Sequence, residues 1–169
     1  MISLHAISSF VIATQLPVVE TASFSEVAAW CNGDEESISR ILRHAITNHI
    51  FAEPLEGHIG HTSISKAVSE VPGLQEWIRV FCEEIWPPTT QLVGATQRWP
   101  ASSEPTKTGF NLASGSKIPF FQELMHSPER AQRFSQAMAV MKMMPGFEPS
   151  LITEAVSYTH LTLPTKRIV

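Results

Sequence analysis

The chain has 169 residues, of which 43% are hydrophobic and 17% charged. This length corresponds to about one domain, and the apolar content is too high for an intrinsically disordered chain. No uninterrupted apolar run approaches the ~20 residues that a membrane-spanning helix needs, so the composition predicts a soluble globular protein without a membrane partner.

The charge balance argues against nucleic acid as a partner. Lys and Arg number 12 and Asp and Glu 16, which gives a net charge of −4, whereas proteins that bind phosphate backbones usually carry a basic surplus. The two cysteines, Cys31 and Cys82, lie in apolar, helical contexts typical of buried thiols in a reducing compartment. The first residues lack the positive charges of a secretory signal, so we expect a cytoplasmic protein.

Two helices joined by a tight turn are predicted early in the chain. Ser23 and Glu26 match the S-x-x-E capping box, which predicts a helix over 24–31. Asp34 can cap the second helix. That helix carries its apolar residues on one face, namely Ile38, Ile41, Leu42, Ala45 and Ile46.

A small hairpin is the strongest β signal in the sequence. The β-prone pairs Ile50-Phe51 and His58-Ile59 flank residues 54–57, whose length and composition suit a hairpin turn. Helix, turn, helix and hairpin in this order predict a winged-helix domain over 1–99. The fold class is therefore expected to be mainly α with a little β.

A long helix with a break is predicted over 74–99. Pro87-Pro88 should interrupt it, and Leu92-Val93 should then resume its apolar face. The polar, proline-rich stretch 100–109 predicts a surface loop. Helical spacing before the prolines is kept by Leu74, Trp77, Ile78, Phe81 and Ile85.

Beyond this linker we expect a short helix over 119–125 and a longer one that starts at Pro128 and ends near 145–146. Proline suits the first helical position, where its missing N–H costs nothing. The inner stripe of the longer helix is expected to hold Ala131, Phe134, Met138 and Met141.

The pattern changes at the C-terminal end. A last helix that opens at Pro149 or Ser150 should end at Val156, and residues 157–169 do not continue the helical stripe. The string SYTHLTLPTKRIV resembles a sequencing adaptor read through in translation, so we expect an artefactual tail. The alternative is a natural, β-prone tail.

Three sequence blocks follow one another in a characteristic order, namely FSEVAAWCNGDEESISRILRHAITNHIFAEPLEGHIGHTSISKAV, WPASSEPTKTGFNLA and SPERAQRFSQAM. In this order they resemble the N-terminal region of fungal S-adenosylmethionine-dependent O-methyltransferases of secondary metabolism, similar to the sterigmatocystin type and more distantly to plant caffeate-type enzymes. The resemblance extends from about Leu4 to Val156.

The resemblance implies a winged-helix dimerisation domain over 1–99, followed over 100–156 by a linker and helices of a substrate lid. A homodimer is expected, since its apolar helix face around Trp77 and Phe81 needs cover. The implied cofactor is S-adenosyl-L-methionine, and the implied substrate is a small aromatic or polyketide acceptor with a hydroxyl group.

The Rossmann-like catalytic domain is expected to be absent from this chain. A methyl-donor site needs closely spaced glycines between a buried strand and a helix, and the eight glycines never cluster in this way. The family's general base, a histidine, would lie in the missing part. The separate chain is therefore expected to be inactive, supplying dimerisation and part of the acceptor pocket.

Four residues are candidates for binding the acceptor. Phe134 and Met138 occupy the family's F-x-x-x-M pattern, one helical turn apart, and the alternative for both is a plain core stripe. Phe110 and Asn111 match the family's FN block, whose asparagine can hydrogen-bond an acceptor oxygen. The alternative for Asn111 is a loop asparagine that forms a turn.

Two functions of other classes stay open at this point. One is a non-catalytic helical homodimerisation module. The other is a winged-helix DNA-binding regulator that presents Arg40, Arg43 and His44, although the acidic residues 34–36 lie at the end of that helix that would approach the bases.

No metal site is expected from the histidine pattern. His58 and His61 form an H-x-x-H, but an odd separation on an extended strand sends the two side chains to opposite faces. The cysteines lie in other elements, so no ligand cluster completes the pair.

Overall fold

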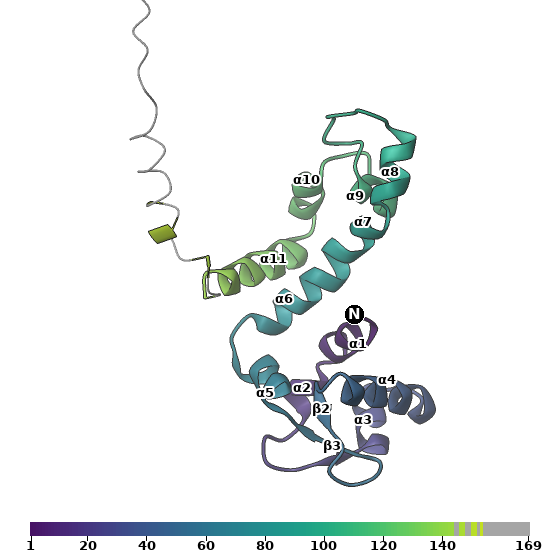
Figure 1. Ribbon diagram of the computed structural model, residues 1–169, viewed down its shortest axis with the longest axis vertical. Coiled ribbons are helices and arrows are strands. Elements are labelled where there is room, and N and C mark those ends of the chain that lie inside the picture. Colours follow the sequence, from purple (N-terminus) through teal and green to yellow (C-terminus); the bar gives the residue numbers. More distant parts are fainter. Residues whose placement is uncertain (144–145, 148–149, 152, 154–169) are drawn as a thin grey trace, which may run out of the picture.

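Figure 1 shows the computed structural model, which describes residues 1–143, 146–147, 150–151 and 153. Within these residues the chain is mainly helical and has one small antiparallel sheet. The expected tail from Ser157, and most of the helix expected before it, lie outside the described residues.

Two helices that were not predicted from the sequence open the chain. They are α1 (Ile2–Ser9) and α2 (Ile12–Gln15), and Val11 between them has a positive φ of 57°. An apolar run without a clear period does not distinguish helix from strand, which explains the omission. The apolar residues of this segment enter the main core, namely Ile7, Ile12, Ala13 and Leu16.

The two capped helices are confirmed as α3 (Phe24–Trp30) and α4 (Glu35–Thr47). Both halves of the capping box form, because the Ser23 N–H donates to Glu26 Oε2 at 2.7 Å and the Glu26 N–H donates to Ser23 Oγ at 3.2 Å. Of the predicted stripe on α4, Ile38, Leu42 and Ala45 are buried, and Ile41 and Ile46 are half-buried.

The predicted hairpin is confirmed and belongs to a three-stranded antiparallel sheet. Its strands are β2 (Phe51–Ala52) and β3 (His58–His61), and Gly57 adopts φ +75° in the turn. A further strand, β1 (Ala22–Ser23), pairs with the other edge of β3 and gives the order β1-β3-β2. A strand of only two residues is too short to show an alternating apolar pattern, so β1 could not be predicted.

Residues 63–98 are almost wholly helical. Helix α5 (Ser63–Glu70), which was not predicted from the sequence, starts at a cap in which the Thr62 hydroxyl accepts from the Ser65 N–H. The predicted long helix comprises α6 (Leu74–Val80), a π-helical turn η1 (Phe81–Ile85) and α7 (Trp86–Thr90), followed by α8 (Leu92–Arg98).

The break expected at Pro87-Pro88 takes the form of the π turn η1 just before them. Both prolines lie in the first turn of α7, where a missing N–H is tolerated. A proline ring clashes with the carbonyl four residues earlier, and the wider π turn makes room at Glu83 and Glu84. The prolines therefore change the winding of the helix without ending it.

Leu92 and Val93 resume an apolar face on α8, but this face is turned to solvent, because their side chains are 62% and 67% exposed. The face of α8 that packs inward contains Gly94 and Ala95. A Cβ at Gly94 would lie 3.1 Å from Leu112 Cδ2 of α9 (Gly109–Ser114), so the small residues let these helices approach closely.

The predicted linker and the two helices after it are confirmed as a loop, α10 (Phe120–Met125) and α11 (Pro128–Met141). The predicted inner stripe of α11 is displaced. Its buried residues are Ala137 and Val140, whereas Ala131, Phe134, Met138 and Met141 are only half-buried. The reason is a close approach to the start of α6, since a Cβ at Gly73 would lie 2.8 Å from Val140 Cγ2.

The elements gather in two regions joined by α6 (Figure 1). The main core lies among α1 to α5 and the sheet, while α7 to α10 cluster at the far end and α11 packs along α6. No helix in the described part of the chain is long and apolar enough to cross a bilayer.

Candidate functional site

An aromatic cluster forms where α9, α10 and α11 meet. The ring of Phe120 lies 5.2 Å from that of Phe110 and 5.7 Å from that of Phe134, both in edge-to-face geometry. Phe121 joins them at 5.2 Å from Phe120 and is 66% exposed. The structure thus brings Phe110 and Phe134 together through Phe120. Neither Phe120 nor Phe121 was predicted from the sequence as a site residue.

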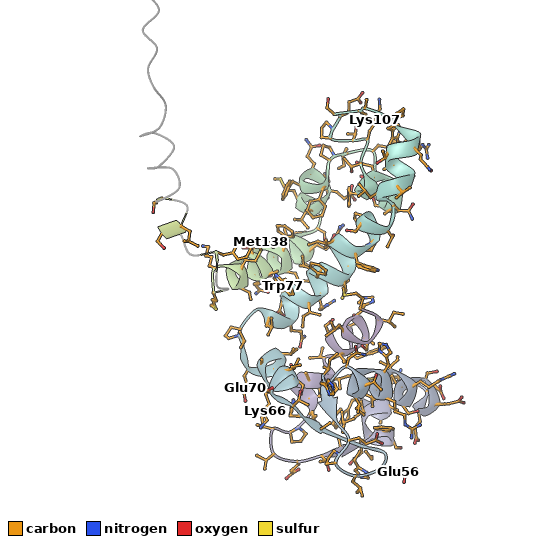
Figure 2. The ribbon with its side chains drawn as sticks, in the orientation of Figure 1. Glu56, Lys66, Glu70, Trp77, Lys107 and Met138 are labelled. Carbon is orange, nitrogen blue, oxygen red and sulfur yellow. The ribbon has the colours of Figure 1, made fainter. Side chains whose placement is uncertain are left out.

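Met138 follows Phe134 by one turn of α11 and is half-buried. Figure 2 shows it on the stretch of α11 that runs beside Trp77 of α6. A thioether is flexible and polarisable, so this position can adapt to a flat apolar ligand as well as to a core. Its partial exposure leaves both interpretations of the F-x-x-x-M pattern open.

Asn111 is directed away from the aromatic cluster. Its Oδ1 accepts from Thr108 Oγ1 at 2.8 Å, and its Nδ2 donates to the carbonyls of Ser116 and Ile118 at 3.0 and 2.9 Å. The residue is buried, and these bonds hold the loop between α9 and α10. Asn111 itself lies in α9, so it is not a loop asparagine that forms a turn; its side chain fixes the loop that follows the helix.

A network of carboxylates and arginines joins the π turn to α11. Glu84 binds Arg130 through two parallel bonds, Nε to Oε1 at 2.8 Å and Nη2 to Oε2 at 2.7 Å. Glu83 binds Arg133 and also Arg79, the latter at 3.2 Å. The paired Glu84 carboxylate, by hydrogen bonding, raises the pKa of Arg130 above its ordinary value, so the guanidinium stays charged.

An open cavity of about 240 Å³ lies between the π turn, α7, α9 and α11. Phe110 and the Glu84–Arg130 pair lie in its wall. Asn111 borders a different hollow of about 420 Å³, with Arg98, Lys107 and other polar residues of the linker. Although Phe110 and Asn111 are adjacent in the sequence, they therefore line two different cavities.

The other groups that the sequence raised do not assemble into a reactive centre. Burial raises the pKa of both the Cys31 and the Cys82 thiol, which disfavours the thiolate. His61 is occupied by the Ser65 hydroxyl at 2.9 Å and the Leu16 carbonyl at 3.1 Å. Among the described residues no three His, Cys, Asp or Glu side chains form a group suited to a metal ion.

Known proteins that resemble the chain agree with the family suggested by its sequence blocks. An O-methyltransferase of Curvularia clavata, kk1A, is 37% identical over 147 residues, which are 86% of this chain and 34% of the relative. The chlorophenol O-methyltransferase of Trichoderma longibrachiatum is 32% identical over 155 residues, 90% of this chain and 33% of the relative. This chain is homologous to part of the fungal O-methyltransferases. It spans about a third of the length of these relatives.

Solved structures extend the likeness to the fold of these O-methyltransferase N-terminal regions. OxaC, solved in complex with SAH and oxaline, superposes with a TM-score of 0.74 at 20% identity, over 82% of this chain and 36% of OxaC. The mitomycin 7-O-methyltransferase MmcR gives 0.67 at 18% identity, over 83% of this chain and 40% of MmcR. No family model matches the chain.

Proposed function

We propose that this chain is the N-terminal region of an S-adenosylmethionine-dependent O-methyltransferase that methylates a hydroxyl of an aromatic or polyketide metabolite. The observation that carries this proposal is the identity of 37% to a fungal O-methyltransferase across 86% of the chain. The aromatic cluster, in which Phe121 is exposed and Phe110 buried, supports an aromatic acceptor, because edge-to-face contacts suit flat rings.

In this proposal residues 1–99 are a winged-helix dimerisation domain and 100–156 are the linker and lid helices. The helix pair α3–α4 and the hairpin β2–β3 support the first part, with β1 as an added strand. Residues 157–169 remain, as proposed from the sequence, an artefactual tail.

The described residues do not fit a site for S-adenosylmethionine. Such a site needs a glycine-rich turn between a buried strand and a helix. Here Gly57 lies in a hairpin, Gly73 precedes α6, and Gly115 ends α9. We therefore place the methyl donor and the general base in a part of the enzyme beyond these residues, and we expect the separate chain to transfer no methyl group.

The contribution that we assign to this chain is one wall of the acceptor pocket. Phe110, Phe134 and Met138 would pack against the ring and exclude water, which favours attack of the oxygen on the methyl group. Asn111 would act mainly by holding the loop that follows α9, because its amide hydrogens are already bound to Ser116 and Ile118.

A DNA-binding regulator finds no support in the geometry of α4. Arg40 is paired with Glu36 at 3.6 Å, and the Arg43 guanidinium lies 5.4 Å from the centre of the Phe24 ring. Both cations are engaged within the chain, and the acidic first turn of α4 would repel phosphate.

We propose that the chain self-associates through the exposed apolar side chains of α8, Leu92 and Val93. Trp77 and Phe81, the pair expected from the sequence to need cover, are stacked at 5.4 Å and half-buried within the chain. Sedimentation at tens of micromolar is expected to show a dimer, and the double variant Leu92→Glu/Val93→Glu a monomer. Val19→Glu, at an exposed position at the other end, is the matched control. A clean monomer of the unaltered chain contradicts this prediction.

A chimera tests the proposed function directly. The chain, joined to the remaining two thirds of the Curvularia relative, is expected to transfer a labelled methyl group from S-adenosylmethionine to phenolic acceptors, with a chlorophenol among those tried. Absence of transfer to every phenol, from a chimera that binds the methyl donor, contradicts the proposal.

In the same chimera Phe134→Ala is expected to lower kcat/KM for the acceptor by about tenfold, because a ring contact is lost. Steady-state kinetics at saturating methyl donor measure this. Phe10→Ala, which removes a partly exposed ring near α1, serves as the control. Equal kinetics for the two variants would assign Phe134 to packing alone.

A further inference from the structure

We propose that the cavity beside the π turn binds a single neutral aromatic ring bearing a carbonyl or hydroxyl oxygen, and that Arg130 donates a hydrogen bond to that oxygen. That this ring is part of the methyl acceptor rests on the proposed function. That the cavity binds such a ring is inferred from the residues of this chain alone.

The size of the cavity sets the number of rings. A cavity of about 150 Å³ is known to hold benzene, and the present one measures about 240 Å³. One six-membered ring with a small substituent fits this space, whereas a fused polycyclic ligand would extend out of its open side.

Arg130 supplies the polar contact. A guanidinium has five N–H donors, and the two used here are bound to the oxygens of Glu84. The remaining N–H groups of Arg130 make no hydrogen bond within the part of the chain that the structure describes. The Glu84 side chain is only 6% exposed and accepts two hydrogen bonds from Arg130. These two bonds fix the orientation of the guanidinium, and with it the direction of its remaining N–H groups beside the cavity.

The charges around the cavity favour a neutral ligand over an anion. Both Glu83 and Glu84 lie in its wall. In the wider network Glu83, Glu84 and Glu129 balance Arg79, Arg130 and Arg133. Arg130 therefore offers hydrogen bonds without a net positive charge, and a bound carboxylate would face two carboxylates.

Phe110 connects the cavity to the aromatic cluster. Its side chain lies in the cavity wall, and its ring contacts Phe120, which in turn contacts Phe134. A ring held by Arg130 would thus lie against Phe110, the one residue of the proposed acceptor wall that lines the cavity.

The test uses the 169-residue chain and three small probes of similar size: acetophenone, benzoate and ethylbenzene. NMR titration is expected to show saturable binding of acetophenone, with benzoate and ethylbenzene each weaker by about tenfold. In Arg130→Lys, which keeps the charge and loses the planar fork, acetophenone is expected to bind about tenfold more weakly. Arg79 also pairs with Glu83 but does not line the cavity, so Arg79→Lys should leave the affinity for acetophenone unchanged.

A second variant keeps the test decisive if Arg130→Lys perturbs the fold. Ala113 is exposed and lies in the cavity wall, so Ala113→Leu fills the space and is expected to abolish acetophenone binding while the chain stays folded. Tighter binding of benzoate than of acetophenone overturns the inference. So does equal acetophenone binding by Arg130→Lys and the unaltered chain.

The outcomes separate this inference from the proposed function. If the chimera methylates phenols but its acceptor KM and kcat are the same with Arg130→Lys, the cavity assignment is wrong and the proposed function stands. If the chain binds acetophenone through Arg130 but the chimera transfers no methyl group, the proposed function fails and the binding site stands. Both proposals are supported if Arg130→Lys raises the acceptor KM of an active chimera and leaves its kcat nearly unchanged.

Discussion

Replacing Glu84 with glutamine is expected to lower the free energy of unfolding by about 2–3 kcal/mol. The neutral amide can no longer accept two charge-assisted bonds from Arg130, which then loses its counter-ion at a site only 32% exposed. The estimate lies below the full cost of breaking a buried ion pair because water still reaches one side of the guanidinium.

Urea denaturation followed by circular dichroism measures this loss. Glu129→Gln is the matched control, because Glu129 also pairs with an arginine of α11, at 3.2 Å, but is 85% exposed. Its effect should stay below about 0.5 kcal/mol. Equal midpoints for the two variants would mean that the Glu84–Arg130 pair does not hold α11 to the π turn.

Gly109→Ala is expected to destabilise the fold by about 2–3 kcal/mol. A Cβ there would lie 2.5 Å from the backbone carbonyl oxygen of Pro88, an atom that cannot move without shifting α7. Because α9 carries Phe110 into the cavity wall, the same variant is expected to move the Phe110 and Phe120 ring signals in NMR spectra.

Gly94→Ala provides the contrast in the neighbouring helix. A Cβ at Gly94 would meet side chains instead of backbone: the flexible Leu112 at 3.1 Å, and Gln91 Oε1 at an ordinary contact distance of 3.7 Å. The gain in helix propensity, up to about 1 kcal/mol, should offset that contact, so the variant is expected to be near neutral. A loss as large as that of Gly109→Ala would contradict the assignment of the close approach to α7.

The elements that could be predicted from the sequence are those with local chemical signals. Ser23, Glu26 and Asp34 mark the starts of α3 and α4, and the turn before His58 marks the hairpin. Helices α1 and α2 and strand β1 have no such signals, because their conformations depend on packing and pairing with distant residues. Periodicity alone also misplaced the buried face of α11, since Gly73 on another helix decides it.

The candidate site was predictable in part. Phe110 and Phe134 were found through resemblance to a family, and the structure connects them through Phe120, which no motif singles out. The Glu84–Arg130 pair spans 46 positions in the sequence, so neither residue indicates the other. For Asn111 the residue type suggested an acceptor contact or a loop turn, whereas the residue lies in α9 and its amide bonds Ser116 and Ile118 of the loop that follows.

The π turn at Phe81–Ile85 is also a place where this chain can change its length. Because such a turn accommodates one extra residue, excision of one residue there would restore ordinary α-helical winding and leave the following residues in nearly the same rotational setting. The side of α7 that faces Gly109 would stay the same, whereas Pro87 and Pro88 would lose the wider turn that makes room for their rings. Related proteins that have lost a codon at this point are therefore expected to keep the contact with Gly109 and to lack the two prolines.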